Sequence, residues 1–266
     1  MIGTGVFTSL GFQLLGIQSF FVLMMLWFIG GLTALCGALT YAELGANLPR
    51  SGGEYNFLSR LYHPAAGFIS GWVSATVGFA APVALAAMTF GAYLSAVFPS
   101  ISSRWSAVSL VILLTLLHCR SRQTSSAVQQ LFTALKVVLI LLFCAAIFIW
   151  GGVPQSAISF APQSGDSTLL FSGAFAVALI YVNYAYTGWN AATYVTSELD
   201  NPQRNLPIVL FVGTGLVMML YLLLNFTFLS AAPIDILAGK LEVGVIVADH
   251  ALGDSAGKAM GLVLAL

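Results

Sequence analysis

Hydrophobic residues come in long uninterrupted runs along this chain, separated by short polar connectors. Two of the runs read SFFVLMMLWFIGGLTALCGALTY and LPIVLFVGTGLVMMLYLLLNFTFL. Each reaches the roughly 20 residues that a helix needs to cross about 30 Å of hydrocarbon. The short alternating segments typical of a transmembrane β-barrel are absent from the sequence. The pattern therefore predicts an all-α, polytopic membrane protein.

Eight membrane segments follow from this pattern. We expect an incomplete first span at about 1–15 and an eighth span that begins near residue 255 and is cut by the end of the chain. We therefore expect either a part of a longer protein or a start codon assigned too late. A short surface helix is expected at 243–252. The six full spans are predicted at about 19–47, 65–98, 105–118, 127–150, 168–197 and 207–230.

Composition agrees with a membrane location. Of the 266 residues, 59% are hydrophobic and 7% are charged, whereas a soluble globular domain carries about 25% charged residues. The net charge is zero, so nothing indicates a nucleic-acid partner. Three scattered cysteines are too few for a metal site or a disulfide framework. We expect the lipid bilayer as a partner, with no metal and no cofactor.

The distribution of basic residues sets the expected orientation. The connectors after spans two, four and six hold more arginine than the opposite set, and such loops lie in the cytoplasm under the positive-inside rule. The start of the chain is then also cytoplasmic, in an integral plasma (cytoplasmic) membrane protein. The arginines in the first set are Arg50, Arg60, Arg120, Arg122 and Arg204, against Arg104, Lys240 and Lys258 on the other side.

Two spans carry residues that weaken a helix in mid-membrane, GTG at 3–5 and YTG at 186–188. A broken helix is tolerated in hydrocarbon only where protein buries it or where it lines a cavity. The two positions correspond if the fold repeats after five spans, which is the pattern of a transporter binding site. Close helix packing is an equal alternative for both, and it is the preferred reading of Gly30, Gly31 and Gly37 in span two.

Two helix breaks would suit a zwitterion such as an α-amino acid. A half-helix that starts after a break exposes N–H groups with partial positive charge, which hold a carboxylate. A half-helix that ends before a break exposes carbonyls, which hold an ammonium group. No charged side chain has to be buried for either contact.

Three motifs, IGTGVF, LPRSGGEYNFL and YAYTGWNAATYVTSELDNPQRNLP, resemble the amino acid–polyamine–organocation superfamily. The resemblance is closest to the L-type amino acid transporter branch and its bacterial relatives. It implies a single transporter domain over 1–266, part of a five-plus-five inverted-repeat (LeuT-type) fold with broken helices 1 and 6. The first repeat would cover about 1–150 and the second about 168–266.

The resemblance also implies roles for individual residues. N–H groups at 2–5 would hold the substrate carboxylate, and carbonyls around 184–187 would hold its amine. Asn190 would bond backbone near the second break, and the loop at 51–53 would pack beneath the site and take part in gating. The expected substrate-binding residues are Ile2, Gly3, Thr4, Gly5, Tyr184, Tyr186, Thr187, Gly188, Trp189 and Asn190.

Lys136 is an ionisable residue inside the fifth span, where such a group is a functional candidate by default. The resemblance implies that its ammonium group stands in for a sodium ion, and it is also a candidate for proton coupling. The alternative is that Lys136 only extends to the cytoplasmic interface.

These expectations lead to a secondary transporter of neutral L-amino acids, because no acidic residue lies beside either break in the sequence. Transport would be sodium-independent exchange or proton symport, with no enzymatic activity. The alternatives are an integral-membrane transferase and a truncated permease fragment that does not transport. No cysteine falls in an expected outer loop, so we predict no obligatory glycoprotein subunit.

Overall fold

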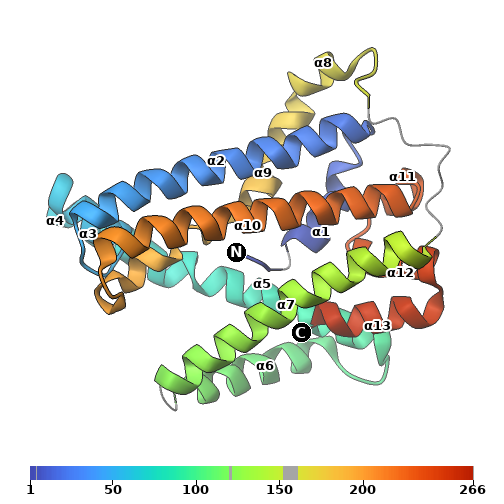
Figure 1. The fold of residues 1–266 in the computed structure, drawn as a ribbon. Helices are drawn as coiled ribbons and strands as arrows, with labels where there is room; N and C mark the ends of the chain where they lie inside the picture. The colour runs from blue at the N-terminus through green and yellow to red at the C-terminus, as the bar shows by residue number, and fades with distance from the viewer. Residues whose placement is uncertain (4, 120–121, 152–160, 266) are drawn as a thin grey trace. The chain divides into compact units, whose positions relative to one another are not determined.

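The computed structural model describes the backbone of residues 1–3, 5–119, 122–151 and 161–265, and every regular element in these ranges is helical (Figure 1). The expectation of an all-α protein is confirmed. The helices are α1 (Gly5–Gln13), α2 (Phe20–Asn47), α3 (Glu54–Leu61), α4 (Pro64–Val73), the π-helix η1 (Ser74–Gly78), α5 (Ala80–Val97), α6 (Ser103–His118), α7 (Arg122–Trp150), α8 (Asp166–Leu170), α9 (Gly173–Tyr186), the 3₁₀-helix η2 (Ala191–Glu198), α10 (Pro202–Ala231), α11 (Ile234–Leu237), α12 (Val243–Leu252) and α13 (Asp254–Ala265).

Four helical segments in the described ranges are long and apolar enough to cross a membrane. They agree with predicted spans two, three, five and seven, and α6 is a shorter apolar helix at predicted span four. The protein is therefore an integral, multi-pass membrane protein. The four segments are Phe20–Asn47, Pro64–Ser95, Ser126–Trp150 and Pro202–Ala231.

The connectors contain more helix than the sequence suggested. The helix predicted at 243–252 is present as α12, but α3 and α11 lie in stretches whose composition predicts polar connectors. α3 has eight residues and follows two glycines with positive φ, Gly52 and Gly53. The segment is shorter than the window of about 11–18 residues in which helical periodicity is read, so it was not recognised. It is held by packing, since it buries Asn56 and Phe57.

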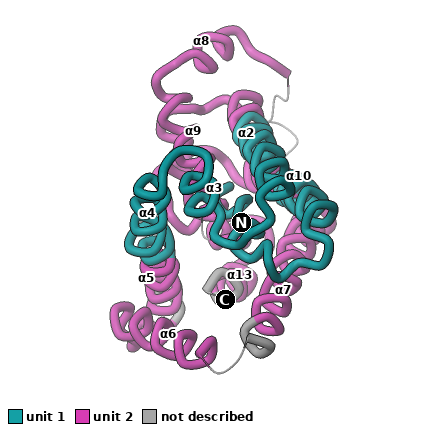
Figure 2. Tube along the Cα trace, turned by 90° about the vertical axis from the view of Figure 1, so that its left-hand side faces the viewer, with its two compact units in different colours: residues 1, 28–82, 186–219 teal, residues 2–27, 83–185, 220–266 magenta. Residues whose placement is uncertain are grey.

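The chain forms two compact units, and each is described on its own (Figure 2). Unit 1 contains residue 1 with 28–82 and 186–219, and unit 2 contains 2–27, 83–185 and 220–266. The boundaries pass through α2, α5 and α10, and between Ala185 and Tyr186 at the end of α9. Each unit is thus built from segments that are far apart in the sequence.

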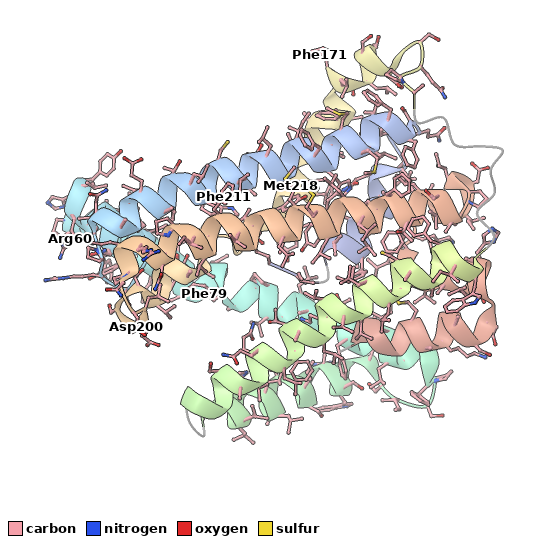
Figure 3. All side chains as sticks on the ribbon, in the orientation of Figure 1. Arg60, Phe79, Phe171, Asp200, Phe211 and Met218 are labelled. Atoms are coloured by element: carbon pink, nitrogen blue, oxygen red, sulfur yellow. The ribbon has the colours of Figure 1, made fainter. Side chains whose placement is uncertain are left out.

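In unit 1, the later part of α2 packs along the early part of α10 (Figure 1). Small residues permit the close approach: a Cβ on Gly31 would lie 2.6 Å from the side chain of Met218, which Figure 3 labels on α10. A Cβ on Gly37 would lie 2.8 Å from the Trp189 ring. The packing role predicted for these two glycines is confirmed.

In unit 2, α1 is held in the interior by contacts with the beginning of α2 and the later part of α10. The Trp27 indole N–H donates to Gln13 Oε1 at 3.0 Å, and Phe7 meets the Phe228 ring edge-on at 6.5 Å between centroids. A Cβ on Gly11 would collide with the Lys240 carbonyl. These contacts fix α1, and with it the segment that the sequence marked as the first break.

Candidate functional site

The helix of the sixth span is interrupted at the predicted place. α9 ends at Tyr186, and Gly188 has a φ of 97°. A left-handed glycine two residues after the last helical residue is a common way to end a helix, because glycine has no Cβ to clash there. The backbone then turns, and the Ala191 N–H donates to the Gly188 carbonyl at 3.1 Å.

The segment that follows is a 3₁₀-helix, η2, instead of a continuation of the α-helix. It has eight residues, and Val195 inside it departs from helical geometry at φ −120° and ψ 21°. Runs of 3₁₀-helix longer than about four residues are uncommon, and they often mark a hinge. The interruption of the sixth span therefore extends well beyond Gly188.

The first predicted break coincides with the start of α1 at Gly5. Thr4 lies outside the described residues. A Cβ on Gly5 would lie 3.0 Å from the Ala185 Cα, so the N-terminus of α1 meets the last turn of α9 within unit 2. Close packing thus explains Gly5 directly, and the same contact brings the positive end of one helix dipole to the negative end of another.

Tyr221 holds one of the carbonyls at this point. Its hydroxyl donates to the Ala185 carbonyl at 3.0 Å, and its side chain is fully buried. The last four carbonyls of a helix lack partners within the helix, so this bond stabilises the end of α9. Sequence reasoning missed Tyr221, because nothing in the sequence distinguishes a tyrosine that donates a hydrogen bond within an apolar span from one that only packs there.

Asn190 forms side-chain contacts, which corrects the expectation that it bonds backbone near the break. Its Nδ2 donates to Glu54 Oε1 and, at 3.1 Å, to the Tyr194 hydroxyl oxygen. Tyr194 donates in turn to Glu54 Oε2 at 2.6 Å. We call Glu54, Asn190 and Tyr194 the Glu54 cluster. All three residues belong to unit 1.

The Glu54 cluster also corrects the view that no acidic residue lies beside either break. Glu54 is 136 residues from Asn190 in the sequence, and α3 brings it there by packing. The prediction was wrong because it considered only neighbours along the chain. The dipeptide Gly52–Gly53 directly before Glu54 was the available signal, since both glycines adopt positive φ at the turn that starts α3.

The loop before α3 is fastened to η2 by further hydrogen bonds. Ser51 and Ser197 each donate their N–H to the other's hydroxyl oxygen at 3.0 Å. The Gly53 N–H donates to the Thr193 carbonyl at 3.2 Å. The loop at 51–53 therefore packs against the segment that follows the break. Its place beneath a substrate site and its gating role stay predictions.

The predicted site residues are divided between the two units. Residues 2–5, Tyr184 and Lys136 belong to unit 2, and residues 186–190 belong to unit 1. Tyr186 is buried, whereas the Tyr184 side chain is 41% exposed. Within the described ranges, no group of three or more histidine, cysteine, aspartate or glutamate residues is arranged to hold a metal ion.

The comparisons with known proteins agree on one family. The chain matches the family model described as amino acid permease over residues 1–266. It is 31% identical over 261 residues to the b(0,+)-type amino acid transporter 1 of Mus musculus, covering 95% of this chain and 53% of that protein. It is 32% identical over 268 residues to the large neutral amino acids transporter small subunit 2 of Mus musculus, covering 95% and 49%. The chain thus spans about half the length of these relatives.

Proposed function

Because the chain belongs to the amino acid permease family, we propose that it forms part of a secondary transporter that carries amino acids across a membrane by alternating access. The relatives reported above are named as amino acid transporters. The observation that carries the proposal is the meeting of two helix ends in unit 2, where Gly5 at the start of α1 packs on Ala185 in the last turn of α9. The LeuT-type inverted repeat, with repeats at about 1–150 and 168–266, is part of the proposal.

These helix ends suit the two charges of an amino acid. The N–H groups at the start of α1 would hold the carboxylate, and carbonyls of Tyr184, Tyr186 and Thr187 would hold the ammonium group. Tyr221 occupies the Ala185 carbonyl, so that group acts in fixing the end of α9. Uncharged donors and acceptors bind a zwitterion without burying a further ion.

We assign a neutral L-amino acid as the substrate. The carboxylate of Glu54 is engaged by the Asn190 amide and the Tyr194 hydroxyl, which leaves it a poor partner for a cationic side chain. One of the relatives is named for large neutral amino acids. Exposed Tyr184 is the proposed outer gate residue, because it stands where the L-type transporters usually have a phenylalanine that acts as a gate over the substrate.

Lys136 is the proposed replacement for a coupling sodium ion. It lies ten residues after Ser126 in the membrane segment of α7, or about 15 Å along the helix axis. That position lies well inside the segment, where an ionisable group is a functional candidate. Transport would then be sodium-independent, by exchange or by proton symport.

The experiment uses the complete reading frame that encodes this chain, purified into liposomes. Uptake of labelled leucine is measured without sodium, at two pH values, with and without unlabelled amino acids inside. Uptake that requires internal amino acid establishes exchange. Uptake into empty vesicles that increases with an inward proton gradient establishes symport. If no amino acid is taken up under any condition, the transporter proposal is wrong.

A Lys136→Gln variant separates the two roles of the lysine. If the ammonium group replaces sodium, the variant loses uptake at every pH. If it carries the coupled proton, the variant keeps exchange and loses only the response to the proton gradient. Wild-type behaviour in both assays would contradict either role.

A further inference from the structure

Glu54 occupies a position that favours a carboxylate. It is the first residue of α3, where the helix N-terminus stabilises negative charge. Its two oxygens accept from different residues, Oε1 from Asn190 and Oε2 from Tyr194. Within the described part of the chain, no basic side chain forms an ion pair with it. Hydrogen-bond donors and the helix N-terminus therefore balance this charge.

The direction of these bonds fixes the Asn190 amide. An ionised carboxylate only accepts hydrogen bonds, so the amide has to turn its NH₂ group toward Glu54. The second hydrogen of that group is used by the Tyr194 oxygen. The hydrogen-bonding atom that the cluster leaves available on Asn190 is Oδ1, an acceptor on a half-buried side chain two residues after Gly188.

Aromatic packing keeps the cluster in place. Phe79, the first residue after the π-helix η1, meets the Tyr194 ring edge-on at 5.3 Å between centroids. Tyr41 meets Trp189, the neighbour of Asn190, at 4.9 Å. Figure 3 shows Phe79 toward the end of unit 1 at which Arg60 and Asp200 project. Ring contacts therefore hold Trp189 and Tyr194, the chain neighbour and one hydrogen-bond partner of Asn190.

We propose that Glu54 is a positioning residue: its carboxylate holds the Asn190 amide so that Oδ1 faces the broken part of the sixth span as an acceptor for the substrate ammonium group. This inference rests on the proposed function, since it concerns how that site is kept ready to bind an amino acid. The residue acts through Asn190 and does not touch the substrate.

A Glu54→Gln change tests the direction of the bonds. The glutamine keeps one acceptor oxygen and presents an NH₂ group in place of the other, so the Asn190 amide is no longer held in one orientation and can turn over to accept from the new amide with Oδ1. The NH₂ group of Asn190 then points to the place of the ammonium group. The lost acceptor corresponds to a rise in KM of about tenfold or more, with kcat less affected.

The double variant Glu54→Gln with Asn190→Asp restores the hydrogen bond between residues 54 and 190 with donor and acceptor exchanged. The new glutamine amide on α3 now donates, and the new aspartate carboxylate after the break accepts with one oxygen. The second carboxylate oxygen remains available at the break. We expect the KM of the double variant to return toward the wild-type value. Arg60→Gln is the matched control, because it removes a charge from the same helix at an exposed side chain in the last turn of α3.

The assay is the uptake of labelled leucine into liposomes by the complete protein, with thermal unfolding measured on every variant. A raised KM in Glu54→Gln, recovery in the double variant and a wild-type KM in Arg60→Gln support the proposal. It is overturned if Glu54→Gln has a wild-type KM, if the double variant does not recover, or if Arg60→Gln shows the same defect. Absence of uptake by the wild type overturns the transporter proposal itself, which is a distinct result.

Discussion

Gly188 is the residue at which the broken sixth span can be tested most directly. Its φ of 97° lies in the left-handed region, where a residue with a Cβ is destabilised by roughly 1–2 kcal/mol. The added Cβ of Gly188→Ala would also lie 3.2 Å from the Met1 backbone nitrogen, closer than an ordinary contact. Together we expect a cost of about 2 kcal/mol for the broken conformation.

That cost has a measurable consequence for substrate binding. Alanine favours a continuous helix over a break, so the conformation that binds falls in population. A difference of about 2 kcal/mol corresponds to roughly a 30-fold change in an equilibrium constant. The KM for labelled leucine in liposomes should increase by up to this factor. Gly188→Asn should lose less, since asparagine tolerates the left-handed region better than alanine.

Gly213→Ala is the matched control for this prediction. Gly213 lies within α10, and a Cβ there would have no atom within 4 Å. Alanine is favoured over glycine in a helix by about 0.5–1 kcal/mol, so this variant should unfold at the same or a higher temperature with an unchanged KM. If Gly188→Ala matches Gly213→Ala in both measurements, the left-handed glycine is not needed for the break and the reasoning fails.

Three other variants test separate contacts. Gly5→Ala places a Cβ 3.0 Å from the Ala185 Cα, and this overpacking should lower the free energy of unfolding by about 1–3 kcal/mol; a wild-type denaturant midpoint would contradict the close packing. Tyr221→Phe leaves the Ala185 carbonyl without its donor, and we expect a loss of about 1–3 kcal/mol together with weaker uptake, whereas unchanged thermal unfolding and uptake would show that the bond is dispensable. Cys119, directly after α6, is exposed. When the other cysteines are replaced by serine, an impermeant maleimide should label it only from the cytoplasmic side. Labelling from outside would contradict the expected orientation.

The hydrophobic pattern was sufficient for much of the architecture. Runs of about 20 apolar residues cross a bilayer as helices. The long helices α2, α7 and α10 lie where these runs predicted them. The break at Gly188 was also predicted, because a β-branched residue followed by glycine weakens a helix locally. These features depend on residues that are neighbours in the sequence.

The Glu54 cluster and the Tyr221 bond were not foreseen, and both join distant segments. Glu54 and Asn190 are separated by 136 positions, and Tyr221 and Ala185 by 36. Neither pair has a spacing that a sequence pattern reveals. The π-helix η1 was missed for a related reason, since Ser74–Gly78 is a stretch whose composition also suits an α-helix. Contacts of this kind depend on the tertiary fold.

The 3₁₀ geometry of η2 has a consequence for distance. A 3₁₀-helix rises about 2.0 Å per residue, against about 1.5 Å in an α-helix. The eight residues of η2 therefore extend about 16 Å, and the same residues would extend about 12 Å with α-helical pairing. A change between the two pairings moves Asn190 and Leu199 about 4 Å relative to each other. With α-helical pairing the segment after Gly188 would thus be shorter, and the Glu54 cluster contacts it both at Asn190 and at Tyr194 within η2.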